Sequence, residues 1–296
     1  MQSNDIVVSI SCITYNHAPY IRQCLDGFMM QKTDFAFEVL IHDDASTDGT
    51  AEIIKEYEAK YPNIIKPIYE EENQWIKGRR GSVVFNFPRA KGKYIALCEG
   101  DDYWTDPLKL QKQVDFLESN DNYSICGHRF LAYDETAKRY YDYDTGINGT
   151  YQLTDLINKG RFCSTLSILF KRSALDIKSY CNCRCHLDIV LAYLLLEKGM
   201  GYCIPEVMAV YRVHNGGVWS GANSDVHHCV NFDVRLALYE LKRNKDSAIF
   251  IISYLKRFGR RWMLKNARTL IKAFRYIQEQ FGMKYTMRLI CMVLFF

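Results

Sequence analysis

The chain has 296 residues, of which 48% are hydrophobic and 14% are aromatic. This composition is typical of a globular protein and excludes a disordered one. The net charge of +4 hides an asymmetry, because residues 230–296 hold 14 Lys or Arg against 4 Asp or Glu and the rest is acidic. The length predicts one large domain, or one domain with an appendage. The basic tail favours an anionic partner surface such as membrane phospholipid.

The cellular compartment can be inferred from what the sequence lacks. The opening residues, MQSNDIVVSISCITYN, have neither the basic nor the apolar region of a secretory signal. Eleven cysteines without such a signal indicate reduced thiols rather than a disulfide framework. No apolar run approaches the roughly 20 residues that a membrane-spanning helix needs. We therefore expect a cytoplasmic protein, either free or peripheral on the inner face of the membrane.

Strands and helices alternate over residues 1–120. Apolar runs predict strands, and helical spacing of apolar residues predicts helices between them. The Asp106-Pro107 pair is a typical helix start, with a capping carboxylate before proline at the first helical position. The predicted strands are 6–15, 37–41, 64–69 and 93–98, and the predicted helices begin near residues 20, 50, 82 and 107. This alternation predicts a mainly parallel sheet that binds ligands beyond the carboxyl ends of its strands.

The pattern changes from about residue 121. We predict strands at 123–133, 165–171 and 201–214, a helix at 187–198, and a flexible loop at 215–221. Beyond this loop the chain is helical and basic. Apolar residues there follow a 4-3-4-3-4 spacing, which defines one helix face: Met263, Ala267, Leu270, Phe274, Ile277 and Phe281.

Two aspartate pairs each follow an apolar run that we interpret as a strand. Asp43 and Asp44 end the run FEVLIH, and Asp101 and Asp102 come shortly after KYIALC. Adjacent carboxylates repel each other and resist leaving water, so a cation or hydrogen-bond donors must offset the cost. Because the carboxyl ends of parallel strands meet at one sheet edge, the two pairs predict a single site. A divalent metal that holds a phosphorylated ligand would satisfy them.

Each pair also has a simpler interpretation. The residues after the first pair can cap the next helix, which explains Asp48 but leaves the pair unexplained. A carboxylate of that pair can accept the N–H of a uracil base. The second pair, within EGDDYW, could be a solvated acidic turn. The apolar strand before it and the Tyr-Trp after it favour a Mg²⁺ or Mn²⁺ site completed by a diphosphate.

Three other motifs do not support the sites that they suggest. An EF-hand loop starting at Asp44 would need Glu where Lys55 stands. Residues 78–81 lack the Gly-Lys-Ser/Thr ending of a Walker phosphate loop. The run CNCRCH, residues 181–186, spaces its cysteines too closely for a usual zinc site, so free thiols are favoured.

The chain resembles the family 2 glycosyltransferases of the GT-A fold, of the kind that build bacterial surface polysaccharides. The matching stretches are VSISCITYNHAPYIRQCLDG, FEVLIHDDASTDGT and CEGDDYWTDPLKL, with weaker matches at HLDIVLAYLLLEKG and YRVHNGGVWSG. The resemblance implies a Rossmann-like α/β fold with a mainly parallel mixed sheet flanked by helices. Residues 1–222 would be the catalytic domain, with a nucleotide-sugar half (1–120) and an acceptor half (121–222). Residues 223–296 would be a basic amphipathic helical extension, which matches nothing that we can assign.

The resemblance implies nucleotide-binding roles for residues at the first two strand ends. Asp44 would bind the uracil base, and Asp43 would serve local structure or the ribose. Thr14, Tyr15 and Asn16 would contact the nucleotide from the first strand.

The same resemblance implies metal-binding and catalytic residues. Asp101 and Asp102 match the family's DxD motif, with Asp102 on Mn²⁺ or Mg²⁺ and Asp101 facing the ribose or a metal-bound water. His214 falls where several members place a third metal ligand, and a structural histidine is the alternative. The family's catalytic base usually lies in a Glu-Asp pair at a helix start. The matching segment here, HLD at 186–188, lacks the Glu but keeps a carboxylate as Asp188.

These residues predict an inverting, metal-dependent transfer from a nucleotide sugar, most simply UDP-linked, to a glycan or lipid-linked glycan. Asp188 would take the proton of the attacking hydroxyl. The metal would neutralise the departing diphosphate, assisted by Arg79 or Arg80. Two alternatives remain. A sugar nucleotidyltransferase would want a Gly-rich stretch near the first strand, and ITYNHAPY offers none. A non-catalytic nucleotide-sugar-binding module would not need Asp188.

Contacts with the acceptor and with partners are less specified. Trp104, His128 and Trp219 are candidates for acceptor or lid contacts, although His128 also fits a structural role and Trp219 a hydrophobic latch. The tail fits an interfacial helix at a membrane, or a helix packed on the catalytic domain or on a homodimer mate. Nucleic-acid binding is not expected, because no recognised module is present.

Overall fold

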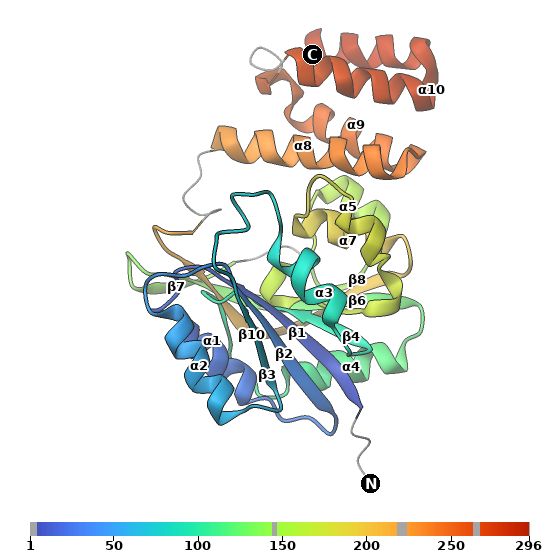
Figure 1. Ribbon diagram of the computed structural model, residues 1–296. Coiled ribbons are helices and arrows are strands. Elements are labelled where there is room, and N and C mark those ends of the chain that lie inside the picture. Colours follow the sequence, from blue (N-terminus) through green and yellow to red (C-terminus); the bar gives the residue numbers. More distant parts are fainter. Residues whose placement is uncertain (1–4, 144–146, 218–223, 263–266, 296) are drawn as a thin grey trace.

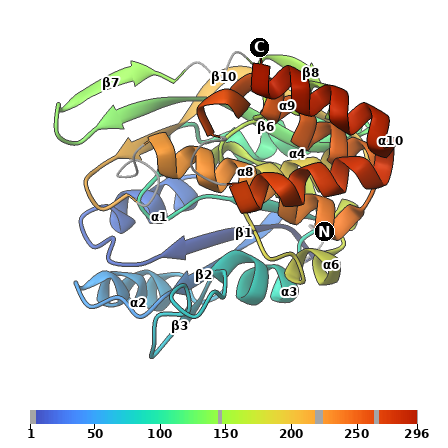
Figure 2. The same ribbon diagram turned by 90° about the horizontal axis from the view of Figure 1, so that it is seen from above.

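The computed structural model describes residues 5–143, 147–217, 224–262 and 267–295. Within these residues a ten-stranded mixed sheet forms the centre, in the order β3-β2-β1-β4-β9-β6-β10-β5, with β7 and β8 paired to β6 and β10. Helices cover both faces of the sheet, and three C-terminal helices stand at one side (Figures 1 and 2). The predicted fold class, a GT-A-like α/β domain with a C-terminal helical extension, is confirmed.

The first half of the sheet is parallel, as predicted. Strand β1 pairs with β2 and β4 in parallel, and β2 pairs with β3 in parallel. The elements over residues 5–120 are β1 (Ile6–Thr14), α1 (Ile21–Met29), β2 (Ala36–Asp43), α2 (Thr50–Lys60), β3 (Ile65–Tyr69), a π-helix (Ser82–Asn86), α3 (Phe87–Arg89), β4 (Tyr94–Leu97), β5 (Tyr103–Trp104) and α4 (Lys109–Ser119). Of these, β5 lies at the far edge of the sheet, antiparallel to β10.

The second half mixes strand directions. Strands β6 and β10 are parallel, and β9 joins the two halves by pairing antiparallel with β4 and β6. The elements are β6 (Tyr123–Asp134), β7 (Arg139–Asp142), β8 (Gly149–Tyr151), α5 (Leu153–Lys159), β9 (Leu169–Lys171), α6 (Ile177–Cys181), α7 (Asp188–Leu196) and β10 (Met200–Val213).

Two separate cores lie on the two faces of the sheet. Successive residues of a strand point to opposite faces, so a buried parallel strand must be covered on both. Val39 and Ile41 pack in the core that includes α1, α2 and α4. Leu40, between them, packs in the core that includes α3, α5 and α7. This explains why the central strands read as unbroken apolar runs.

The predicted strand over 165–171 is only partly correct. Residues Thr165–Ser167 form a 3₁₀ turn, and β9 begins at Leu169. The carbonyl oxygens of Leu166 and Ser167 accept hydrogen bonds from the side chains of Trp104 and Gln113, at 2.8 and 2.9 Å. Because these side chains satisfy the buried carbonyls, no neighbouring strand is needed there.

The C-terminal extension consists of α8 (Ser224–Lys242), α9 (Lys245–Trp262) and α10 (Ala267–Phe295), which is kinked at Gly282. These helices share a core in which Leu270 and Ile277 are buried and Phe274 and Phe281 partly buried. The predicted apolar face of the last helix therefore packs within the protein, while Met263 lies outside the described residues. Helix α8 contacts α7, and α9 contacts α5.

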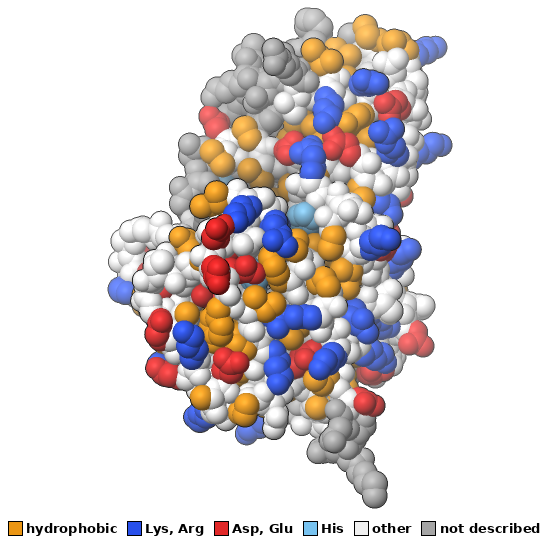
Figure 3. Space-filling model, in the orientation of Figure 1, with side chains coloured by type: hydrophobic (Ala, Val, Ile, Leu, Met, Phe, Trp, Pro, Cys, Tyr) orange, Lys and Arg blue, Asp and Glu red, His pale blue; other side chains and the backbone are white. Residues whose placement is uncertain are grey.

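The packing of the extension bears on the two interpretations of the basic tail. On the face shown in Figure 3, basic, acidic and hydrophobic side chains are interspersed over these helices. The aromatic and basic side chains at 258–265, which favoured membrane contact, lie outside those that the structure describes. None of the described helices is long and apolar enough to cross a membrane.

The first residue of α4, Lys109, is a buried lysine. The Lys109 side chain is 0% exposed, and its Nζ donates a 2.8 Å hydrogen bond to Gln113 and lies 3.8 Å from the centre of the Trp104 ring. Among the described residues, no carboxylate lies within ion-pair distance of it. Burial lowers the pKa of Lys109 to about 7. Between about pH 7 and pH 10 the unfolded chain therefore binds a proton at Lys109 that the folded chain does not bind. This difference lowers the free energy of unfolding.

Replacing this lysine by methionine is expected to stabilise the fold. Lys109→Met removes the cost of the lowered lysine pKa, about 5 kcal/mol at neutral pH. It also leaves the buried Gln113 oxygen without its donor, so the free energy of unfolding should rise by about 2 kcal/mol in all. Urea denaturation at pH 7.5 and pH 10 measures it. The gain should vanish or reverse at pH 10, where the penalty is small. Lys178→Met, at an exposed position, is the control, and a less stable Lys109→Met at pH 7.5 would contradict the prediction.

Candidate active site

The carboxyl ends of β1, β2 and β4 are joined by backbone hydrogen bonds. The N–H of Asp44 donates to the Thr14 carbonyl at 3.0 Å, and the N–H of Gly100 donates to the Ile13 carbonyl at 2.9 Å. A side chain at Gly100 would lie 2.8 Å from Thr14 Oγ1, so only glycine permits this approach. The two aspartate pairs are thus held on either side of the first strand end, as the parallel-sheet prediction required.

The first pair accepts hydrogen bonds from within the protein, and each Asp44 oxygen, with one such bond, keeps a further lone pair. Asp43 is buried and accepts hydrogen bonds from Ser46, including one of 2.5 Å from its hydroxyl. Burial raises the pKa of Asp43, and the bonds from Ser46 oppose that rise. The two oxygens of Asp44 accept the backbone N–H groups of Gln74 and Trp75, at 2.6 and 3.1 Å. Asp44 therefore anchors the 70–81 loop beside the strand ends.

The other predicted nucleotide contacts surround these strand ends. Thr14 Oγ1 is buried without a hydrogen-bond partner, and Tyr15 is 45% exposed. Asn16 has a left-handed backbone, with φ of 54°, and its side-chain oxygen accepts the N–H of Thr47 at 2.8 Å. The loop after β1 is therefore fastened to the loop after β2, while Tyr15 remains open to a ligand.

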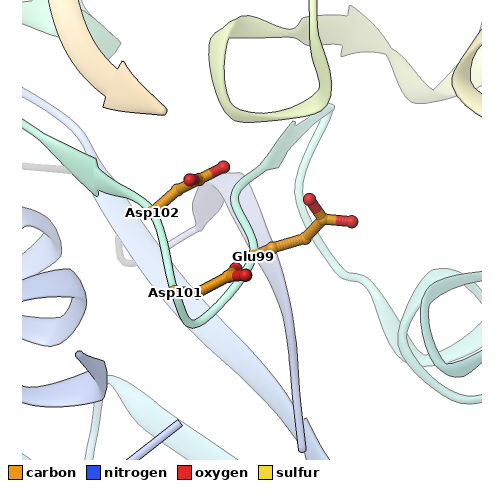
Figure 4. Close-up of side chains that lie close together, drawn as sticks. All are labelled: Glu99, Asp101 and Asp102. Carbon is orange, nitrogen blue, oxygen red and sulfur yellow. The ribbon is translucent and has the colours of Figure 1, made fainter. Parts of the chain in front are cut away.

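Three carboxylates converge in the loop between β4 and β5. Glu99, Asp101 and Asp102 each offer an oxygen atom, and these oxygens lie within 4.8 Å of one another. Their side chains leave the loop toward the same side (Figure 4). Asp102 is 1% exposed; its Oδ1 accepts the backbone N–H of Arg212 at 2.8 Å, and its Oδ2 has no hydrogen-bond partner.

The cluster is electrostatically costly without a cation. Burial raises the pKa of Asp102 well above its usual range, and the charges of Asp101 and Glu99 raise it further. Burial, with the charges of Asp101 and Asp188, raises the pKa of Glu99 to about 8. The unpartnered buried oxygen of Asp102, aimed among other carboxylates, fits a hard divalent cation such as Mg²⁺ or Mn²⁺.

Histidine and arginine side chains support the cluster from β10 and the loop after β1. His214 Nε2 lies 3.1 Å from Asp101 Oδ2, and His17 Nε2 lies 3.7 Å from the same oxygen. Burial alone would raise the pKa of Asp101, but the contact with His214 and the charges of both histidines lower it. Arg212 donates from Nε to the Asp101 carbonyl at 2.8 Å. His214 is therefore placed against the acidic cluster, in contact with Asp101.

Asp188 is the first residue of α7, and its Oδ1 accepts the N–H of Ile189 at 2.7 Å. Asp188 is exposed to the cavity that it lines, but the protein atoms around that cavity desolvate the carboxylate, and this desolvation raises the pKa of Asp188. The charge of Asp188 also raises the pKa of Glu99. The position at a helix N-terminus partly offsets the desolvation.

One cavity of about 370 Å³ brings several predicted site residues together. Arg80, Asp102 and Asp188 all line it, together with Glu99 and Trp75. The Arg80 guanidinium carbon lies 3.4 Å from the centre of the Trp75 ring, and one of its nitrogens, Nη1, is buried without a partner. Burial lowers the pKa of Arg80. The cavity therefore holds a base candidate, a cationic side chain and a carboxylate cluster.

Two of the three candidate acceptor or lid residues, Trp104 and His128, do not line this cavity. Trp104 is 2% exposed and packs against Phe28 in the core. His128 is buried with Nδ1 2.7 Å from the Arg129 carbonyl, and burial lowers its pKa well below the usual value. Trp219 lies outside the described residues.

Sequence reasoning did not assign roles to three residues that shape the site. Glu99 was noted in the acidic string but given no function, Trp75 was not singled out, and Arg212 was missed. A sequence signal existed for Arg212, because it lies two residues before His214 in the predicted strand 201–214, and alternate residues of a strand share a face. Trp75 lies in a loop without periodicity, so only the fold brings it to the cavity.

Comparisons with known proteins agree with this geometry. The sequence model of the family described as Glycosyl transferase family 2 matches residues 9–177. An uncharacterised protein of Mycobacterium tuberculosis is 38% identical over 221 residues, 74% of this chain and 62% of that protein. The chain thus spans less than two thirds of the length of this relative.

Two further relatives carry functional names. The putative teichuronic acid biosynthesis glycosyltransferase TuaG of Bacillus subtilis is 31% identical over 217 residues, 72% of this chain and 82% of that protein. The UDP-Glc:alpha-D-GlcNAc-diphosphoundecaprenol beta-1,3-glucosyltransferase WfaP of Escherichia coli is 29% identical over 217 residues, 72% of this chain and 79% of that protein.

Solved structures share the fold at low sequence identity. TarS of S. aureus in complex with UDP-GlcNAc superimposes with a TM-score of 0.69 at 18% identity, over 96% of this chain and 84% of that one. The mannosyltransferase PcManGT of Pyrobaculum calidifontis, in complex with GDP-Man and Mn²⁺, gives a TM-score of 0.55 at 17% identity, over 97% of this chain and 79% of that one.

Proposed function

Because the chain belongs to glycosyl transferase family 2, we propose that it is an inverting, metal-dependent glycosyltransferase. It moves a sugar from a UDP-linked donor to a hydroxyl group of a glycan or lipid-linked glycan. The observation that carries this proposal is that Asp102, with its unpartnered buried oxygen, and Asp188, at a helix N-terminus, line the same cavity. A metal ligand and a base facing one space are what such a transfer requires.

The assignment of the donor rests on the strand ends and on the relatives. WfaP is named for UDP-Glc, and TarS was solved with UDP-GlcNAc. In our proposal Asp44 accepts the uracil N–H, and Asp43 keeps the loop in place through Ser46. Thr14, Tyr15 and Asn16 contact the nucleotide from the first strand end, and Asp101 faces the ribose.

Asp102 would hold the cation, Mn²⁺ or Mg²⁺, with Glu99 and Asp101 beside it. The cation, when bound, supplies positive charge that stabilises the departing diphosphate. His214 is the candidate third ligand, and its contact with Asp101 keeps it near the cluster. Arg80 lines the same cavity and offers a planar donor group to phosphate oxygens.

The chain's own groups would perform the proton transfer. Asp188 takes the proton from the acceptor hydroxyl as that oxygen attacks the anomeric carbon on the side opposite the diphosphate. The raised pKa of Asp188 makes it a stronger base than an aspartate with the ordinary pKa. One base and no protein nucleophile are consistent with inversion.

The larger organisation is also part of the proposal. Residues 1–120 bind the nucleotide sugar, 121–222 bind the acceptor, and 223–296 form the extension. The acceptor is a glycan or lipid-linked glycan, as the name of WfaP illustrates for that relative. We place the reaction in the cytoplasm, at the inner face of the membrane where the basic tail contacts anionic lipid. Homodimerisation through the extension is the alternative use of that surface.

A panel of nucleotide sugars tests the donor assignment. UDP-Glc and UDP-GlcNAc with Mn²⁺ should raise the melting temperature by several degrees, because ligand at about 100 times its Kd adds about 2.7 kcal/mol of stability. GDP-Man with Mn²⁺ should have little effect, and omitting Mn²⁺ should weaken the UDP-sugar response. A shift with GDP-Man alone, or none with any UDP-sugar, would reject the UDP assignment.

A further inference from the structure

A second cavity, of about 200 Å³, lies where α5 meets the C-terminal helices α8 and α9. Its described lining contains four Lys or Arg and two His side chains and no Asp or Glu. The lining residues are Ile157, Asn158, Lys159, Gly160, Arg161, His227, His228, Asn231, Arg235, Ser253, Tyr254 and Arg257. A concave site with this composition attracts an anion.

Arg235 is the buried member of this set. Its side chain is 3% exposed and lies between the rings of Phe250 and Tyr254, 4.3 and 4.4 Å from their centres. Nη1 donates to the Asn231 carbonyl at 2.5 Å, while Nε is buried without a hydrogen-bond partner. Burial lowers the pKa of Arg235 to about 10, so the group remains charged at neutral pH.

No carboxylate within the described chain forms an ion pair with Arg235. A buried cation without a carboxylate partner is costly, and the two ring contacts and one hydrogen bond of Arg235 offset only part of that cost, so an anionic ligand would stabilise it further. Gly160, with φ of 79°, ends α5 beside it, and a side chain there would lie 3.2 Å from Arg235 Nη2. The glycine thus keeps the guanidinium accessible from the sheet domain.

The second cavity adjoins the candidate active site. Gly160, Arg161 and Asn231 line both cavities. Asn231 belongs to α8, so the extension contributes directly to the active-site wall. A ligand longer than one sugar unit can therefore occupy both cavities at once.

We propose that the second cavity binds a phosphate group of the acceptor while the acceptor hydroxyl lies in the first cavity. Several Lys and Arg side chains around one space match the two charges of a diphosphate, or of successive phosphodiesters, better than the single charge of one sugar carboxylate. The phosphate has two sources, the diphosphate of a lipid-linked glycan or a phosphodiester within a glycan chain. This inference rests on the proposed function for the identity of the acceptor.

Calorimetric titration of the full chain in EDTA tests the site. The probes are inorganic phosphate, a sugar carrying a methyl diphosphate, and a short glycerol-phosphate oligomer. The Lys159→Gln/Arg257→Gln variant changes exposed side chains that line only the second cavity. It should bind these probes about tenfold more weakly, the effect of losing charge-assisted hydrogen bonds. Arg275→Gln, 79% exposed on α10, should bind them as the wild type does.

The outcomes separate this inference from the proposed function. Stronger binding of the diphosphate probe assigns the lipid-linked source, and stronger binding of the oligomer assigns the phosphodiester source. Equal affinity of the double variant and the wild type, or no binding by the wild type, overturns the proposal. Binding of UDP with Mn²⁺ is measured on the same protein preparations after dialysis into buffer without EDTA. Its absence in the wild type rejects the proposed donor site, whereas its presence without phosphate binding rejects only the second site.

Discussion

Asp188→Asn should lower the rate of sugar transfer by about 10³-fold, the usual contribution of a general base, and leave UDP binding with Mn²⁺ unchanged. Asparagine keeps the size of the side chain and its hydrogen bond from the Ile189 N–H, but it cannot take a proton from the acceptor. Steady-state transfer rates and UDP titrations on the same preparation measure the two effects. If the protein were a non-catalytic binding module, the wild type would transfer no sugar, and the substitution would cause no loss.

The control for this prediction is another aspartate at a helix start. Asp176 caps α6 and accepts the N–H of Ser179, and it lines neither described cavity. Asp176→Asn should leave both transfer and UDP binding unchanged. In the wild type the rate should fall as pH drops through the raised pKa of Asp188, since only the ionised form accepts a proton. Undiminished transfer by Asp188→Asn would exclude this residue as the base.

Asp102→Asn should have two effects of opposite sign. Without metal, the variant should melt at the same temperature as the wild type or higher. The substitution removes a buried charge whose pKa is raised by burial and by Asp101 and Glu99, while its side-chain oxygen can still accept the Arg212 N–H. Transfer should fall by about 10³-fold, because a metal site loses its charged ligand. Thermal melts with UDP, with and without Mn²⁺, and transfer assays measure both.

A carboxylate away from the cluster provides the comparison. Asp121 is exposed at the turn before β6, and Asp121→Asn should change neither the melting temperature nor its response to Mn²⁺. If Asp102→Asn still gained stability from Mn²⁺ with UDP as the wild type does, Asp102 would not be the metal ligand. Loss of stability without metal would show that its charge is compensated by groups other than a cation.

The paired effects in Asp102→Asn reflect a general property of binding sites. Holding like charges together lowers the stability of the fold. A ligand of opposite charge binds more tightly to such a site, because it relieves the repulsion. The same reasoning applies with the sign reversed at Arg235, where a buried cation lacks a carboxylate partner in the described chain. The two cavities therefore carry opposite excess charges and share one wall. A donor with its metal and an acceptor phosphate would occupy them without competing.

Much of the sheet could be predicted from the sequence. Unbroken apolar runs and the Asp-Pro helix start are local signals whose physical meaning does not depend on distant residues. Because parallel strands share a carboxyl edge, these signals also predicted that Asp43, Asp44, Asp101 and Asp102 would lie at one edge. The partial error at residues 165–171 arose because the groups that satisfy its carbonyls, on Trp104 and Gln113, are distant in sequence.

The sequence by itself therefore determined the alternation of the main strands and helices up to residue 120, the family, and the acidic strand ends, since each depends on short-range pattern and chain direction. Only the tertiary structure decided which of those residues share a space. It buried Trp104 and His128 in the core, set Arg212 against the acidic loop, and brought Asn231 from the extension into the cavity wall. Such placements depend on how helices and strands far apart in the chain pack, and no local pattern records that packing.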